Sequence, residues 1–167
     1  MSSPISRRAV LAQTAALAAT AGAFSIVPRH VLGGPRNIPP SEKMNIAGIG
    51  VGGMGATNLR ALESENIVAL CDVDAKRLGA AAAKFPKAKC YADFRKLFDE
   101  LEKKIDAVVI STPDHTHFHP AYWAIERGKH IYLEKPLAHN VWEIRTLTNL
   151  AAEKRVATQL GAQRHTL

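Results

Sequence analysis

Apolar residues along this chain gather either in short uninterrupted runs or in longer stretches with helical spacing. The short runs predict strands, because a strand that is buried on both faces is apolar throughout. The longer stretches place apolar side chains every three or four residues, as a helix with one buried face does. The runs predict six strands, at residues 46–49, 67–71, 88–91, 105–110, 129–133 and 156–160.

Helical stretches separate these runs. Asp93 is placed to cap one helix, and Pro86 and Gly128 follow the ends of two others. Regular alternation of strands and helices is typical of the α/β class, so we predict a Rossmann-type, doubly wound parallel sheet of about six strands. The expected helices cover residues 56–62, 75–85, 94–101 and 141–154, with a further helix through residues 121–125.

The chain before residue 44 has a different pattern. Ser6-Arg7-Arg8 precedes an uncharged, alanine-rich stretch that reaches Val27, and residues 28–41 are rich in Pro, Gly and Arg. A basic start before a moderately apolar stretch predicts a secretory signal, and the paired arginines indicate the twin-arginine (Tat) export machinery. We therefore expect residues 1–43 to be signal peptide and linker in a periplasmic or secreted protein. An uncleaved membrane anchor is the alternative.

Length and charge limit the remaining possibilities. The 167 residues allow one domain after the signal, at residues 44–167, and the net charge is +7. Residues 1–43 hold five basic side chains against one acidic, whereas the rest of the chain holds 17 basic and 14 acidic, interspersed. No basic patch with interleaved aromatics appears, which argues against a nucleic-acid partner. Cys71 and Cys90 both fall in predicted strands, so we expect two core thiols rather than a disulfide.

A glycine cluster follows the first predicted strand and precedes a helix. Gly50-x-Gly52-x-x-Gly55 matches the dinucleotide-binding fingerprint, whose glycines permit a tight turn, close approach to a pyrophosphate, and close helix–strand packing. A second register beginning at Gly48 also fits, but the first leaves the strand at residues 46–49 intact. The predicted pyrophosphate cradle consists of Gly50, Val51, Gly52, Gly53, Met54 and Gly55.

An acidic residue follows at the spacing that the fingerprint expects. Asp72 ends the second predicted strand, 22 residues after Gly50, where an acid hydrogen-bonds a ribose hydroxyl. Together these features predict a nicotinamide dinucleotide site. The carboxylate favours NAD because it would repel the 2′-phosphate of NADP. Lys76 and Arg77 lie close behind and could neutralise that phosphate, so NADP stays open.

Two further segments follow later strands. Residues 111–117 come after the fourth strand, and Glu134-Lys135-Pro136 comes after the fifth. Ligands of such sheets bind outside the carboxyl ends of the strands, so we expect both segments to meet the glycine cluster there. Lys135 could orient a substrate hydroxyl at that edge and remove its proton, and Pro136 could take a cis bond.

Three alternating histidines, His115, His117 and His119, suggest a metal site at first sight. The string begins where a strand has ended and a helix is starting, and helical neighbours two apart diverge by about 200°. No cysteine or carboxylate cluster completes a site. We therefore expect no metal, and a polar loop with one or two histidines near a ligand.

Four motifs carry a resemblance to a known family. Gly-Ile-Gly-Val-Gly-Gly-Met-Gly at 48–55, Cys-Asp-Val-Asp at 71–74 and Ser-Thr-Pro-Asp-His-Thr-His at 111–117 come first. The most specific is Gly-Lys-His-Ile-Tyr-Leu-Glu-Lys-Pro-Leu at 128–137. In this order and spacing the chain from Met44 onward resembles the Gfo/Idh/MocA oxidoreductases.

The resemblance implies a role for each candidate residue. Gly50, Gly52 and Gly55 would hold the pyrophosphate, and Asp72 the adenosine ribose. Glu134 would contact the nicotinamide ribose, and Lys135 would act catalytically at the reacting carbon. The residues that would border the nicotinamide end are Ser111, Thr112, Pro113 and His117, with Gln163 as a looser match to a cofactor contact.

The resemblance also implies what is missing. Family members carry a second α/β domain that binds substrate and supplies further catalytic residues, whereas this chain stops at Leu167. We therefore expect a truncated chain, complete for cofactor binding and incomplete for turnover. The implied function is the NAD(P)-binding domain of an exported oxidoreductase that acts on CH–OH groups of sugars or polyols. The alternatives are the cofactor half of an NAD-dependent glycoside hydrolase and a non-catalytic nucleotide-binding module.

Overall fold

The computed structural model describes residue 39 and residues 42–162. Every element discussed below lies in one compact unit, Lys43–Leu167. The predicted signal segment and Gln163 lie outside the described residues. Within the described part of the chain, no helix has both the length and the apolar character needed to cross a membrane.

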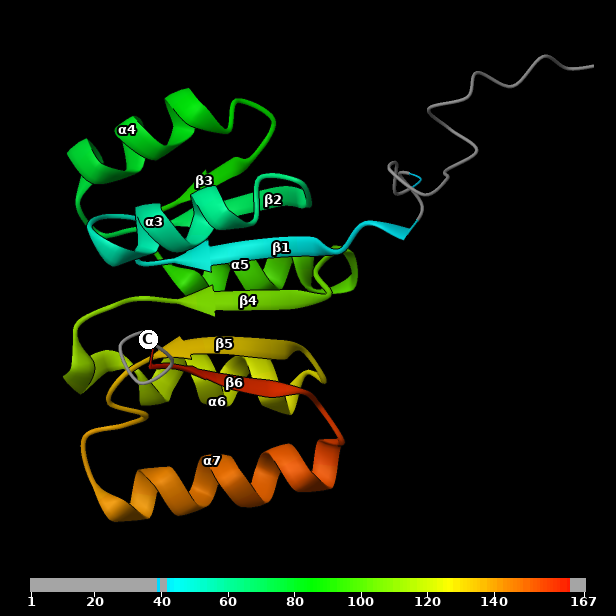
Figure 1. Ribbon diagram of the computed structural model, residues 1–167, viewed down its shortest axis with the longest axis vertical. Coiled ribbons are helices and arrows are strands. Elements are labelled where there is room, and N and C mark those ends of the chain that lie inside the picture. The colour runs from blue at the N-terminus through cyan, green and yellow to red at the C-terminus, as the bar shows by residue number, and fades with distance from the viewer. Residues whose placement is uncertain (1–38, 40–41, 163–167) are drawn as a thin grey trace, which may run out of the picture. The chain divides into compact units, whose positions relative to one another are not determined.

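Six parallel strands form a single sheet in the order β3-β2-β1-β4-β5-β6 (Figure 1). The chain builds outward from β1 to β3 and then crosses back to β4, so the strand order reverses between β1 and β4. This reversal is the switch point at which doubly wound sheets bind ligands. The strands are β1 (Asn45–Ile49), β2 (Asn66–Cys71), β3 (Lys89–Tyr91), β4 (Ala107–Ile110), β5 (His130–Glu134) and β6 (Thr158–Gly161).

Helices connect the strands in the predicted alternation. They are α3 (Met54–Ala61), α4 (Ala75–Lys84), α5 (Phe94–Leu101), α6 (Phe118–Glu126) and α7 (Val141–Lys154), with short 3-10 turns η2 (Glu102–Lys104) and η3 (Asp114–Thr116). The predicted fold class is confirmed, and Asp93 caps α5 by accepting a hydrogen bond from the N–H of Arg95. The fourth strand begins at Ala107 rather than residue 105. The Asp106 carboxylate there accepts a bond from the N–H of Asn45.

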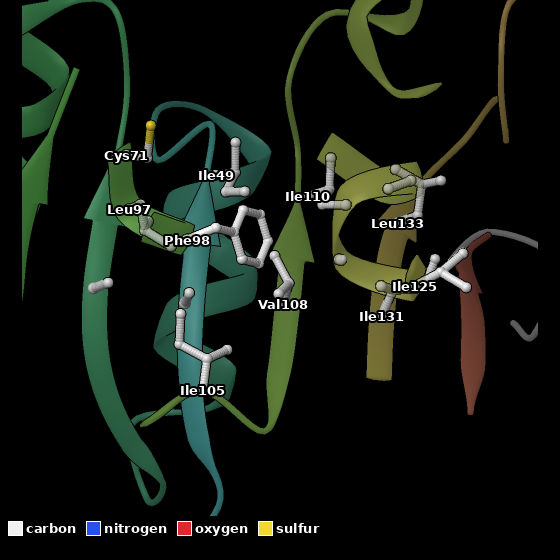
Figure 2. Close-up of a cluster of buried hydrophobic side chains, with 14 of the residues drawn as sticks. Ile49, Cys71, Leu97, Phe98, Ile105, Val108, Ile110, Ile125, Ile131 and Leu133 are labelled. Carbon is white, nitrogen blue, oxygen red and sulfur yellow. The ribbon is translucent and has the colours of Figure 1, made fainter. Parts of the chain in front are cut away.

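Two apolar clusters lie on opposite faces of the sheet. Phe98 of α5 and Ile125 of α6 pack with Ile49, Val108 and Leu133 on one face (Figure 2). On the other face, Leu59 of α3 and Ala81 of α4 pack with Ile46, Leu70 and Val109. Helices therefore cover both faces, which leaves the carboxyl ends of the strands as the open edge.

The two cysteines have different environments. Cys71 is buried at the end of β2, where desolvation, with further contributions from Asp72 and Asp93, raises the pKa of its thiol to about 12. Cys90 is exposed, and the expectation that it is a core thiol is wrong. β3 is an edge strand of three residues with an exposed surface, so its position in a strand does not bury it. Both thiols are free.

We expect a disulfide reagent to modify one thiol of the native protein at pH 8. A pKa of about 12 leaves only about one Cys71 thiol in ten thousand ionised at that pH, and the thiolate is the reactive form. Absorbance of the released thiolate should report one equivalent in native protein, two in guanidinium, and almost none in native Cys90→Ser protein. Rapid labelling of native Cys90→Ser protein would contradict the burial of Cys71.

Candidate functional site

A glycine turn joins the end of β1 to α3. Gly50 has a φ of 78°, a value that favours glycine, and its N–H donates to the carbonyl oxygen of Cys71 at 2.8 Å. A Cβ on Gly55 would overlap the carbonyl oxygen of Gly50, so only glycine allows α3 to pack directly on the turn. β1 ends at Ile49, and the geometry therefore agrees with the fingerprint register that begins at Gly50.

The start of α3 has the properties of a phosphate site. No side chain caps this helix end, and its first turn contains no acidic residue. A Cβ on Gly53 would meet open space, whereas one on Gly52 would lie 2.5 Å from Cδ of Arg77, which places a cationic side chain beside the turn. Unpaired backbone N–H groups and the helix dipole favour an anion at such an end. The turn therefore fits the pyrophosphate of a dinucleotide.

Asp72 supports this turn from the end of β2. Its Oδ2 accepts a hydrogen bond from the N–H of Val51 at 2.9 Å, and its Oδ1 accepts one from the N–H of Asp74 at 2.9 Å. A carboxylate has about four acceptor positions, so these two bonds leave capacity for ribose hydroxyls. The structure thus gives Asp72 a bracing role that the sequence motif alone does not indicate.

The segment after β4 lies against the glycine turn. The N–H of Ser111 donates to the carbonyl oxygen of Ile49 at 2.9 Å, and a Cβ on Gly50 would lie 2.7 Å from the Ser111 backbone. Next to it, the Thr112 hydroxyl is buried without a hydrogen-bond partner among the described residues. Pro113 then leads into the 3-10 turn η3. Ser111, Thr112 and Pro113 therefore lie beside the turn, as expected.

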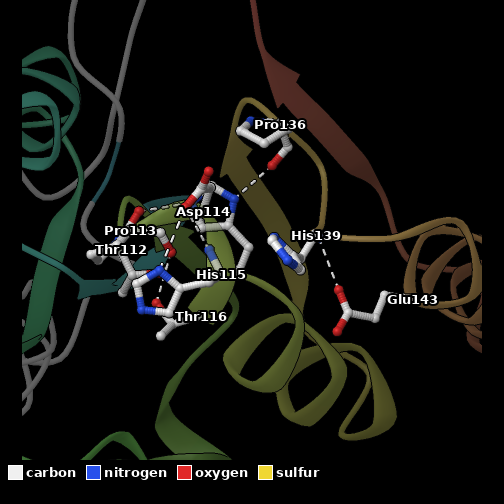
Figure 3. A network of polar contacts seen from close by, with 9 residues as sticks. Thr112, Pro113, Asp114, His115, Thr116, Pro136, His139 and Glu143 are labelled. Carbon is white, nitrogen blue, oxygen red and sulfur yellow. Dashed lines mark hydrogen bonds and ion pairs between the residues drawn. The ribbon is translucent and has the colours of Figure 1, made fainter.

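His117 joins this segment to the one that follows β5. Its side chain is 1% exposed, with Nδ1 at 2.6 Å from the carbonyl oxygen of Pro136 and Nε2 at 2.8 Å from that of Thr112. Figure 3 shows the segment from Thr112 to Thr116 and the contact that reaches Pro136. Both ring nitrogens contact backbone carbonyls, so His117 connects two loops at the sheet edge.

The other two histidines of the string point away from this contact. His115 is exposed, with Nδ1 3.5 Å from the Asp114 carboxylate, and His119 is exposed against the ring of Phe118. The three side chains therefore diverge, as the helical geometry predicts. Within residues 42–162, no three His, Cys, Asp or Glu side chains are grouped to share a metal ion.

Glu134 is the last residue of β5, and Lys135 follows it in a contrasting environment. Glu134 is only 7% exposed, and its Oε1 accepts a hydrogen bond from Nδ2 of Asn58 at 2.9 Å. Nδ2 of Asn58 also lies 3.1 Å from Oγ of Ser111. Lys135 is exposed beside this buried carboxylate, and its peptide bond to Pro136 is cis. The three predicted segments therefore converge at one edge, linked by Asn58 and His117.

Three residues of this edge were absent from the sequence analysis. Asn58 reaches the site from α3, the Tyr132 hydroxyl lies 3.4 Å from Oε1 of Glu134, and a Cβ on Gly161 would lie 2.8 Å from the same oxygen. The contact of Tyr132 with Glu134 could have been predicted from the sequence, because residues two apart in a strand share a face. No sequence pattern indicates the contacts of Asn58 and Gly161, since these contacts depend on how α3 and β6 are placed against β5.

A cavity of about 470 Å³ lies away from this edge. Its lining is mainly apolar and includes Ile125, Leu147, Ala151 and Val156. None of the predicted site residues lines it. The chemistry-bearing side chains gather at the strand ends instead, so the candidate site is the edge and not the cavity.

Comparisons with known proteins agree with this geometry. The family model described as "Oxidoreductase family, NAD-binding Rossmann fold" matches residues 44–162. The chain is 38% identical over 99 residues to inositol 2-dehydrogenase 2 of Saccharopolyspora erythraea, which covers 57% of this chain. It is 36% identical over 121 residues to glycosyl hydrolase family 109 protein 4 of Phocaeicola vulgatus, which covers 68%.

A solved structure extends the comparison to three dimensions. GenD2 from gentamicin A biosynthesis, in complex with NAD, superposes with a TM-score of 0.67 at 25% identity over 82% of this chain. The matched region is 37% of that protein. The regions matched to the other two relatives make up 29% of the inositol dehydrogenase and 23% of the glycosyl hydrolase. The chain therefore spans about a quarter of the length of these two relatives.

We expect His117→Phe to lower the free energy of unfolding by about 2 kcal/mol, because it removes the buried imidazole that contacts the carbonyl oxygens of Thr112 and Pro136, and a lost hydrogen bond that leaves its partner unsatisfied costs about 1–3 kcal/mol. Phenylalanine keeps a ring but removes both nitrogens. His115→Phe is the matched control, and its exposed position predicts a change within about 0.5 kcal/mol. Urea denaturation followed by circular dichroism measures both. Equal effects in the two variants would contradict the bridging role of His117.

Proposed function

This chain belongs to the Gfo/Idh/MocA oxidoreductase family, and on that premise we propose that its Rossmann domain is the NAD-binding part of an oxidoreductase acting on CH–OH groups of sugars or polyols. The observation that carries the proposal is the convergence of three segments at the switch point. The glycine turn, the Ser111–Pro113 loop and Glu134-Lys135 meet there through contacts from Asn58 and His117. Similarity to an inositol dehydrogenase supports the substrate class.

The adenosine half of the cofactor fits the glycine turn. We assign the pyrophosphate to the glycine turn, where the N–H groups of Gly50, Val51 and Gly55 already have acceptors and those of Gly52, Gly53 and Met54, at the uncapped end of α3, would face the ligand. Asp72 is assigned to the adenosine ribose, whose hydroxyls would share the carboxylate with the N–H groups of Val51 and Asp74. The negative charge of this group favours NAD over NADP.

The nicotinamide half lies toward β4 and β5. Ser111, Thr112 and Pro113 are assigned to its border, and the Thr112 hydroxyl there is buried without a hydrogen-bond partner among the described residues. Glu134 is assigned to the second ribose. We assign His117 an indirect role, because its buried ring holds Thr112 and Pro136 in place.

Lys135 is the proposed catalytic residue. NAD, when bound, supplies the hydride acceptor for oxidation of an alcohol carbon. Lys135 is exposed and directly follows β5 at the same edge, where its Nζ would hold the substrate hydroxyl and exchange its proton. Positioning of the hydroxyl against the cofactor supplies much of the rate in such reactions.

A second candidate is the cofactor half of an NAD-dependent glycoside hydrolase. The 36% identity to a glycosyl hydrolase family 109 protein over 121 residues favours it. In that chemistry NAD oxidises the sugar transiently and is regenerated, so glycoside cleavage without net NADH formation separates it from a dehydrogenase. The pair Arg7 and Arg8 supports the further proposal that the protein is exported through the twin-arginine route.

We expect the 167-residue chain to bind NADH saturably, with a dissociation constant between about 1 μM and 1 mM, the range of typical substrate affinities. NADH fluorescence measures it. Gly52→Asp should abolish saturation because a carboxylate would repel the pyrophosphate. Gly79→Asp, at a glycine of α4 with open space around its Cβ, is the matched control and should bind normally. Absence of saturable binding by the unmutated chain at several millimolar NADH would refute the proposal.

We expect Asp72→Asn to reduce the preference for NADH over NADPH by about tenfold, because it removes the charge that repels the 2′-phosphate. The ratio of the two dissociation constants is the measurement, since any loosening of the turn affects both cofactors alike. Asp74→Asn is the matched control. Its carboxylate accepts from the first N–H groups of α4, so the ratio should change less than twofold. An unchanged ratio in Asp72→Asn would count against the proposed ribose contact.

A further inference from the structure

Asn58 connects the two halves of the candidate site. It lies on α3, one turn beyond Gly55, and its Nδ2 makes two contacts: Oγ of Ser111 at 3.1 Å and Oε1 of Glu134 at 2.9 Å. The orientation of the amide follows from chemistry, because a carboxylate accepts but cannot donate. The nitrogen must therefore face Glu134, and its two hydrogens match its two partners.

Glu134 needs such a donor. Its side chain is 7% exposed, and burying a carboxylate is costly unless hydrogen bonds compensate for the lost water. The Tyr132 hydroxyl lies farther away, at 3.4 Å. On the β6 side, a Cβ on Gly161 would lie 2.8 Å from Oε1, so the absence of a side chain there makes room for the carboxylate. Glu134 is thus held between Asn58 of α3 and the backbone of β6.

We propose that Asn58 is a positioning residue for the cofactor: it fixes the Glu134 carboxylate where the nicotinamide ribose would meet it. The inference rests on the proposed function, which assigns that ribose to Glu134. Because α3 also begins at the pyrophosphate turn, Asn58 sets the distance between the group that holds the phosphates and the group that holds the second ribose. The position of Asn58 on α3 therefore fixes the distance between the proposed pyrophosphate site and the proposed contact with the nicotinamide ribose.

This role predicts a selective loss of affinity. Asn58→Leu keeps a similar volume and removes both donors. It should weaken NADH and ADP-ribose by about tenfold, the value of one hydrogen bond to a charged group. ADP contains the adenosine ribose and the pyrophosphate but lacks the second ribose, so its affinity should change less than twofold. NADH fluorescence measures the first ligand, and displacement of NADH measures the other two.

Two further variants test whether Asn58 acts through Glu134. Adding Asn58→Leu to Glu134→Ala should weaken NADH binding by less than a further twofold, because the carboxylate to be positioned is already gone. Asn66→Leu is the matched control. Asn66 makes a comparable side-chain contact, to Oδ1 of Asn45 at 3.2 Å, at the opposite end of the strands, so NADH affinity should not change. Should Asn58→Leu fail to fold by circular dichroism, Asn58→Ser is expected to show the same pattern.

The outcomes separate this inference from the proposed function. If the unmutated chain binds no NADH, the proposed function fails. If it binds NADH and Asn58→Leu or Asn58→Ser binds equally well, only the positioning role fails. An equal loss for ADP and ADP-ribose would also overturn it, because a general disturbance of α3 would affect the phosphate turn as well. A full tenfold loss on top of Glu134→Ala would show that Asn58 acts independently of the carboxylate.

Discussion

The close contact between α3 and the glycine turn determines most of what this edge can do. A side chain at Gly55 would overlap the Gly50 carbonyl oxygen, so the helix can lie directly on the end of β1 only with glycine there. That packing brings the uncapped helix end to the switch point between β1 and β4. It also carries Asn58 into reach of Glu134, two strands away in the sheet. The absence of a side chain at Gly55 thus positions both the proposed phosphate site and the Glu134 carboxylate.

The contacts at the edge form two bridges with different chemistry. Asn58 links α3 to the ends of β4 and β5 through side chains, whereas His117 links the loops after the same two strands through their backbone carbonyls. Side-chain bridges fix the groups that would meet a ligand. Backbone bridges fix the loops that carry those groups. Each bridge contains one buried side chain, Glu134 in the first and His117 in the second.

The sequence was sufficient for the fold because its signals are local. Apolar runs, the glycine turn and the Asp93 cap each act within a few residues, and strands ending at Ile49 and Ile110 followed from them. Burial at the sheet edge was not local. Cys90 lies in a strand yet is exposed, because β3 has no neighbour on its outer side. The contact of Gly161 with Glu134 depends on the register of β5 against β6, and the partners of Asn58 depend on how α3 packs against the ends of β4 and β5. No short motif encodes either arrangement.

The bracing of the turn by Asp72 has a consequence for how cofactor preference can change. The same carboxylate accepts the Val51 N–H and stands where the proposed ribose contact is made. A substitution that removes the oxygens of this side chain to admit a 2′-phosphate also removes an acceptor from the turn that is proposed to hold the pyrophosphate. The proposed preference for NAD and the support of the glycine turn therefore depend on the same side chain. Asparagine at position 72 would remove the charge and keep one acceptor oxygen for the Val51 N–H, whereas alanine or glycine would remove both the charge and the acceptor.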